Sequence, residues 1–335
     1  MSAGGDEPGK PDGPMAFAEM DGQPEQASPP PANAAQPSEG EERPEALYYQ
    51  AALQEVQRIL TAVKAKQPPV LGALQRITAG IARAVGTGDD LLLQALEPGE
   101  SQVDLAKHMV NVAVFAAKIG QAAGLRDEEL PWLTVAAALH DIGMLAVPSA
   151  VVQKPGPLTD EERAVIGRHP EAGFRLLQGL GAEFEWLANV AYQEHERDDG
   201  SGYPRGLKGD QIHDYAKIVG LADTYEALTH WRPYRKTGVS SDVVKEIILT
   251  ERRRFPDRIL KGLIRGLSTV PVGSLVRLNS NEIARVVATN PAFPLRPLVE
   301  VVQGPKGEKL DVPRRIDLST NTLLYIAKPS AEKAV

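Results

Sequence analysis

The sequence predicts a mainly helical protein with a small β domain at its C-terminal end and a disordered N-terminal tail. Residues 1–45 contain nine Pro and six Gly, and such a segment buries too little apolar surface to offset its chain entropy. From Leu47 onward, apolar residues recur at the spacing of one helix face. After about Ser268, the pattern changes to short β-type runs that Asn, Gly and Pro separate.

The helical part divides into segments that apolar periodicity defines and that Pro and Gly delimit. Thr159 and Glu162 form a capping box, which is typical of a helix start. The stretch 198–209 holds four Gly and one Pro and is expected to be a loop. We expect helices over residues 47–63, 71–81, 91–96, 102–124, 130–140, 159–169, 183–196, 211–230 and 241–266, the last one interrupted near Pro256.

Short β-type runs near the C-terminal end predict a small domain of four or five strands. The runs are Ser274–Leu278, Ile283–Ala288, Leu298–Val302 and Leu323–Ile326. The expected organisation is therefore a tail over residues 1–45, an N-terminal helical segment over 46–100, a second helical domain over 101–267 and a β domain over 268–335.

The composition limits the kinds of function. The chain has no Cys, so any metal must be held by His, Asp or Glu. No apolar run approaches the ~20 residues of a membrane span, and no basic region precedes an apolar core at the N-terminus. The net charge is −7, but ten acidic residues against one Lys and one Arg give residues 1–45 a net charge of −8. The near-neutral remainder is not typical of a nucleic-acid binder, and we expect a cytoplasmic protein that binds neither DNA nor a membrane.

Several histidines lie in acidic contexts on predicted helices, as metal ligands do. His140 and Asp141 are adjacent at the end of an apolar helix, and His108 follows Asp104 by four residues, so that both face one side. The other candidates are His169, Glu194, His195 and Asp223. Taken singly, each histidine is more often a structural residue than a ligand, and an isolated His-Asp pair is weak evidence. His213 and His230 are interpreted as structural.

The order of these residues is more specific than any one of them. The segments ALHDIG, GPLTDEE, RHPEAG, HERDDGSGYPRGLKGDQI, IVGLADTYEAL and RPYR follow one another over residues 100–240. In this combination and order the chain resembles the HD-GYP family, with weaker similarity extending back to Leu47.

The resemblance implies a helical bundle of the HD type that binds two or three divalent metal ions, usually iron or manganese. Family members open the ring of cyclic di-GMP, giving pGpG and in some cases GMP. Carried over by position, the implied ligands are His108, His140, Asp141, His169, Glu194, His195 and Asp223, with Asp104 as an extra ligand for a third ion. His140 and Asp141 would take part in catalysis, and Asp141 would bridge two metal ions.

The resemblance also implies residues for the substrate. Gly202, Tyr203 and Pro204 form the GYP loop, whose alternative role is purely structural. Arg232 and Arg235 match positions that contact the phosphate or guanine of the ligand, and a surface role is their alternative. The expected partner is cyclic di-GMP or a related cyclic dinucleotide. Protein partners and a homodimer stay open.

Three positions depart from the family pattern. Met144 stands where the family has lysine, Glu194 replaces the first histidine of a His-His-Glu run, and Glu226 replaces an aspartate. Three functions therefore stay open: an active cyclic di-GMP phosphodiesterase, a degenerate domain that binds nucleotide or a partner protein without efficient turnover, and an HD-type hydrolase of another phosphoester.

Deleting the tail tests its interpretation. We expect the fragment 46–335 to keep the fold, because residues 1–45 lack core-forming side chains. Thermal unfolding at equal metal content measures this, and a lower melting temperature of the fragment would contradict it.

Overall fold

The structure of the 335-residue chain is a computed structural model. It describes residues 44–87, 90–97, 104–229, 240–267, 272–290, 293 and 296–329. The expected tail therefore lies outside the described residues, except for its last two positions.

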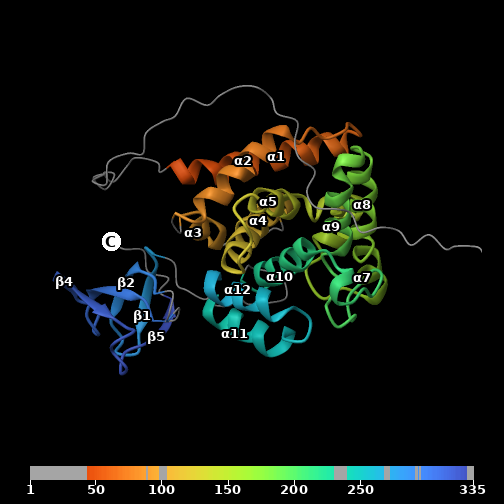
Figure 1. Ribbon diagram of the computed structural model, residues 1–335. Helices are drawn as coiled ribbons and strands as arrows, with labels where there is room; N and C mark the ends of the chain where they lie inside the picture. The colour runs from red at the N-terminus through yellow and green to blue at the C-terminus, as the bar shows by residue number, and fades with distance from the viewer. Residues whose placement is uncertain are drawn as a thin grey trace, which may run out of the picture. The chain divides into compact units, whose positions relative to one another are not determined.

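The described residues confirm a mainly helical protein with a small C-terminal antiparallel sheet (Figure 1). The helices are α1 (Pro44–Lys64), α2 (Gly72–Ala84), α3 (Asp90–Leu96), α4 (Leu105–Ala122), α5 (Leu130–Leu139), α6 (Ser149–Val152), α7 (Asp160–Ile166), α8 (His169–Gln178), α9 (Glu185–Gln193), α10 (Asp214–Thr229), α11 (Ser240–Glu251) and α12 (Asp257–Leu267). Short 3-10 helices are η1 (Ile142–Ala146), η2 (Ala182–Phe184) and η3 (Gly209–Gln211).

Helix α4 forms the centre of the helical core. Its residues from Met109 to Ala117 are all buried, as expected for a helix that is apolar on all sides. It packs against α1, α5, α10 and α12. Among the described residues, no helix combines the length and the apolar character that crossing a membrane requires.

The region around His169 differs from the sequence prediction. The Thr159–Glu162 capping box is present and starts α7, but this helix ends at Ile166 rather than near His169. A new helix, α8, begins at His169, with Pro170 in its first turn. Proline is well tolerated there because the first N–H groups of a helix have no partner within it. The proline therefore marks a helix start that the sequence prediction missed.

The five strands pair in the order β4-β3-β2-β1-β5, with antiparallel neighbours. They are β1 (Leu275–Leu278), β2 (Ile283–Ala288), β3 (Leu298–Gln303), β4 (Lys309–Asp317) and β5 (Ile326–Pro329). Strand β4 was not predicted, because it contains Pro313, and an edge strand tolerates proline. The predicted run Leu323–Ile326 is shifted to β5, since the Asn321 side chain accepts the N–H groups of Leu323 and Leu324 in a turn.

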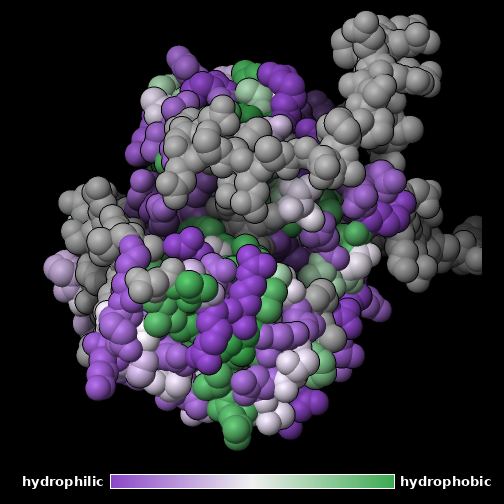
Figure 2. All heavy atoms as spheres, turned by 90° about the vertical axis from the view of Figure 1, so that its left-hand side faces the viewer, coloured by the Kyte–Doolittle hydropathy of each residue, from purple (hydrophilic) through white to green (hydrophobic). Residues whose placement is uncertain are grey.

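The sheet has its own small hydrophobic core, which includes Val276, Val286 and Val299. Large hydrophobic side chains are exposed on β4 and in the turn before β5, with Val312 at 80% and Leu323 at 82%. On the face of the molecule that Figure 2 shows, hydrophobic residues lie in separate groups between hydrophilic ones.

Removing the sheet tests whether the helical part is self-sufficient. We expect a fragment ending at residue 267 to bind the same metal per molecule and to keep its turnover per loaded site. The reason is that the buried hydrophobic residues of the helices and of the sheet form two separate clusters. A lost reaction in a fragment whose helices remain folded would show that the sheet contributes to the site.

Candidate metal centre

The seven ligands that the sequence predicts come together in two groups. The first, called the His195 group, consists of Asp141, His169, Glu194 and His195. The second, called the His108 group, consists of His108, His140 and Asp223. Within each group, the candidate ligand atoms lie within 4.8 Å of one another.

Helix ends supply three of these side chains. His140 caps the C-terminus of α5, His169 begins α8, and Glu194 caps the C-terminus of α9. A Cβ atom on Gly143 would collide with the backbone of His169 and Gly173. The glycine of the HDIG motif therefore allows η1, which follows Asp141, to approach the start of α8.

Contacts at Nδ1 orient three of the histidines. The Nδ1 of His140 donates to the carbonyl of Ala137 at 2.7 Å, and the Nδ1 of His169 donates to the carbonyl of Ile166 at 2.8 Å. The Nδ1 of His108 lies 2.8 Å from Oε2 of Glu226. Carbonyl and carboxylate oxygens accept hydrogen bonds, so each Nδ1 carries a proton and each Nε2 faces the centre.

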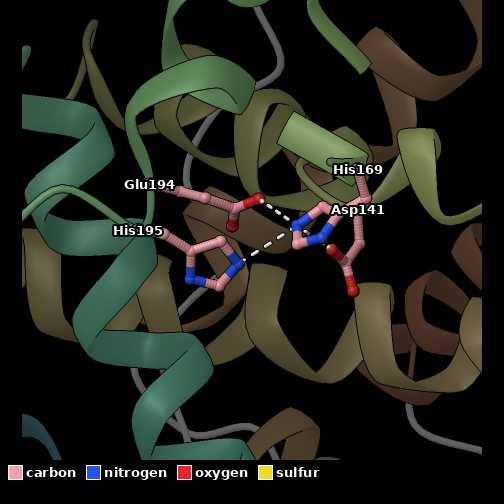
Figure 3. Close-up of side chains that lie close together, drawn as sticks. All are labelled: Asp141, His169, Glu194 and His195. Atoms are coloured by element: carbon pink, nitrogen blue, oxygen red, sulfur yellow. Dashed lines mark hydrogen bonds and ion pairs between the residues drawn. The ribbon is translucent and has the colours of Figure 1, made fainter. Parts of the chain in front are cut away.

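Two carboxylates lie between the groups. Asp141 places Oδ1 3.1 Å from Nε2 of His169 and Oδ2 3.4 Å from Nε2 of His108. Glu194 places its two oxygens 3.6 Å from Nε2 of His169 and 3.6 Å from Nε2 of His140. Each carboxylate therefore offers one oxygen to either group. Because Glu194 stands where the family has a histidine, the site has a second carboxylate between the two groups (Figure 3).

The carboxylates change the protonation of the histidines. Burial lowers the pKa of His169, but the neighbouring carboxylates, Glu194 first and Asp141 after it, outweigh burial and raise that pKa to about 9. Burial likewise lowers the pKa of His108, but neighbouring carboxylates, Glu226 first among them, raise it well above its usual value. Both positions therefore attract cations, and a bound metal ion would displace protons there.

The residues fit divalent metal ions. The Nε2 atom of His140 and both oxygens of Glu194 are buried without a hydrogen-bond partner among the described residues. The Nε2 atoms of His169 and His195 lie 3.1 Å apart, where two lone pairs repel each other unless a proton or a cation lies between them. Imidazole nitrogens and carboxylate oxygens suit divalent Fe, Mn or Zn.

Other predicted site residues lie elsewhere. Asp104 caps helix α4 and accepts the backbone N–H of Lys107 at 3.1 Å, and it is in neither group. Arg232 and Arg235 lie outside the described residues. The ring of His213 accepts the backbone N–H of Tyr215, in agreement with a structural role.

The GYP loop lies against the His195 group. The Tyr203 ring stacks on His195 with centroids 4.7 Å apart, and the Tyr203–Pro204 peptide is cis. A Cβ atom on Gly202 would collide with the backbone of residues 195–197, so close approach requires this glycine. The buried Glu196 accepts the N–H groups of Arg205 and Leu207 and fixes the loop. The sequence interpretation assigned no role to Glu196.

Glu226 has a role that the sequence did not reveal. It was noted only as a departure from aspartate, but it is buried and its carboxylate faces Nδ1 of His108. Partners of this kind fix the orientation and tautomer of a metal-binding histidine. A buried glutamate three residues after Asp223 on a helix is the signal that could have indicated it, since both residues lie on one helix face.

Family models match both parts of the chain. The model of the HD domain matches residues 90–259, about half of the chain. The model of a KOW domain associated with HD domain matches residues 275–335, which include all five strands.

Curated relatives match part of the chain. A cyclic di-GMP phosphodiesterase of Pseudomonas aeruginosa is 34% identical over 62% of this chain and 50% of its own length. The cyclic di-GMP phosphodiesterase response regulator RpfG of Xanthomonas campestris is 40% identical over 45% of this chain and 40% of its own length. The 3'3'-cGAMP-specific phosphodiesterase 3 of Vibrio cholerae is 40% identical over 39% of this chain and 28% of its own length. The chain thus spans half or less of the length of these relatives.

A solved structure shares the fold. The HDG"Y"P protein from Bdellovibrio bacteriovorus superposes with a TM-score of 0.55 over 65% of this chain and 70% of that one, at 17% identity. The HD domain model spans the helices that carry all seven grouped side chains. On this match and on its ordered motifs, the chain belongs to the HD domain family, in the HD-GYP group.

Proposed function

We propose that this protein is a metal-dependent phosphodiesterase that hydrolyses cyclic di-GMP to pGpG, GMP or both. The observation that supports this proposal is the convergence of seven ligand side chains in two adjacent groups with Asp141 and Glu194 between them. The names of the relatives support the substrate class, because they are phosphodiesterases for cyclic di-GMP or 3'3'-cGAMP.

The two groups would hold two divalent metal ions, with iron and manganese as the expected elements. Such ions, when bound, supply a nucleophile from water at neutral pH and relieve charge on the phosphoryl oxygens. The chain contributes the preset ligand orientation, because backbone carbonyls and Glu226 hold three imidazoles with Nε2 toward the centre. Asp104 is left out of this ligand set, since its carboxylate caps α4.

The substrate would lie beside the His195 group. Tyr203 is 40% exposed and stacked on His195, so it borders the centre from the solvent side. We place Arg232 and Arg235 at the phosphates or guanine bases of the dinucleotide, because a guanidinium forms bidentate hydrogen bonds and stacks on planar rings.

A turnover assay with metal analysis on the same sample tests the proposal. Purified protein, loaded with Mn²⁺ or Fe²⁺, should bind about two ions per chain, the number of ligand groups, and linearise cyclic di-GMP. 3'3'-cGAMP serves as the competing substrate, and faster hydrolysis of it would change the proposed specificity. A metal-loaded protein that hydrolyses neither dinucleotide would contradict the proposed activity.

One observation favours a second function, nucleotide or partner binding without efficient turnover. Met144 lies in η1, three residues after Asp141, and its N–H donates to the Asp141 carbonyl. Met144 therefore puts an uncharged thioether one turn after Asp141, at the position where the family has a lysine. Tight dinucleotide binding by a metal-loaded protein without product would support this function.

A further inference from the structure

A line of buried polar side chains connects helix α1 with the metal centre. Tyr49 of α1 is 3% exposed, and its hydroxyl donates to Oδ1 of Asn111 on α4 at 2.6 Å. Burial, and after it the charges of carboxylates such as Glu97, raise the pKa of Tyr49. The phenol therefore stays protonated and acts as a donor.

Asn111 continues this series of hydrogen bonds from α1 to α10. It is 1% exposed, and its Nδ2 donates to Oε1 of Glu226 on α10 at 3.3 Å. Turning the amide over would place its oxygen against the carboxylate, with two acceptors facing each other. Tyr49 and Glu226 together therefore fix the amide in one orientation.

The line ends at a ligand. The second oxygen of Glu226 lies 2.8 Å from Nδ1 of His108, and Nε2 of His108 faces Asp141 and Asp223 at 3.4 Å each. A carboxylate at Nδ1 favours the tautomer that leaves the Nε2 lone pair free and makes it more basic. The donors of Tyr49 and Asn111 thus point toward Glu226, whose second oxygen faces Nδ1 of His108.

We propose that helix α1 positions the metal ligand His108 through Tyr49 and Asn111, so that docking of α1 and metal binding strengthen each other. Helix α1 ends before residue 90, where the HD domain match begins, yet it packs against α4 within the same core (Figure 1). Coupling between two sites is reciprocal. A metal ion that gains affinity from a docked α1 must therefore hold α1 more firmly in place. The inference rests on the proposed metal centre.

The test compares Tyr49→Phe with Tyr48→Phe in the full chain. Both changes remove one hydroxyl from neighbouring positions of α1, but the Tyr48 ring packs over Gly80 of α2 and is no part of the line. Competition with a chelator measures Mn²⁺ affinity, and hydrogen exchange with and without Mn²⁺ measures the protection of residues 44–64. Loss of one neutral hydrogen bond predicts a Mn²⁺ affinity about threefold to tenfold lower for Tyr49→Phe. Tyr48→Phe should match the wild type.

The exchange experiment separates positioning from general stability. In the wild type, Mn²⁺ should slow exchange in α1, and in Tyr49→Phe this added protection should shrink by the same factor as the affinity. Asn111→Leu, which removes both hydrogen bonds at similar volume, should lower Mn²⁺ affinity ~10–100-fold.

Several results would overturn the inference. Equal Mn²⁺ affinity of Tyr49→Phe and the wild type would do so while leaving the proposed function intact. If Tyr49→Phe does not fold, unchanged exchange of α1 on adding Mn²⁺ to the wild type would also overturn it. A wild type that binds no Mn²⁺ at all would refute the proposed metal centre and this inference together.

Discussion

Replacing Asp141 with alanine should empty both metal positions, because its two oxygens face both groups. We expect metal affinity to fall by more than ~100-fold, since even an outer-shell partner of a ligand is worth 10–100-fold. The helices should remain folded at reduced stability, because bound metal contributes binding free energy to the folded state only. Elemental analysis and thermal unfolding measure the two effects.

His140→Ala gives a sharper version of the same test. His140 belongs to the His108 group, so this variant should lose the ion of that group first and keep the ion of the His195 group at intermediate metal concentrations. His213→Ala is the matched control, because it removes a half-buried imidazole that accepts the backbone N–H of Tyr215 and is in neither group. Unchanged metal content in both Asp141→Ala and His140→Ala would show that the ligand assignment is wrong.

Met144→Lys should raise the rate of cyclic di-GMP hydrolysis by roughly a hundredfold, the usual effect of one preorganised contact to developing charge. The cation should accelerate the chemical step more than it tightens substrate binding, because it interacts most strongly when charge builds up in the transition state. Residue 144 is half-buried and follows Asp141 by one backbone-bonded turn, so it is the position of this motif at which a cation is tested. Single-turnover rates and dinucleotide affinity separate the two contributions.

Met144→Leu is the control for packing, and it should behave like the wild type. A wild-type rate that equals or exceeds the rate of Met144→Lys would mean that another cation, such as Arg232, already serves the scissile phosphate. If the wild type, Met144→Lys and Met144→Leu all bind metal but none hydrolyses the dinucleotide, Glu194 is indicated as the disabling change. Glu194→His would then be the variant that restores activity.

The fold class and the candidate ligands could be predicted from the sequence alone. Apolar periodicity and Pro or Gly boundaries located most helices, because helix formation and helix ends depend on neighbours within a few positions. The motif order selected seven side chains, and the structure brings all seven together. The local interpretation of proline failed, because a proline can end an element or be tolerated within one. Pro170 lies in the first turn of α8, and Pro313 lies in the edge strand β4.

The division of those side chains into two groups, and the contacts that support them, became visible only in the folded structure. Folding placed Asp141 and Glu194 between two groups and turned Glu226 toward Nδ1 of His108. It also joined Tyr49 to Asn111 across 62 positions and Asn111 to Glu226 across 115. Contacts over such separations depend on how whole helices pack around α4, and packing is set by the shape of the entire core rather than by any local pattern of residues.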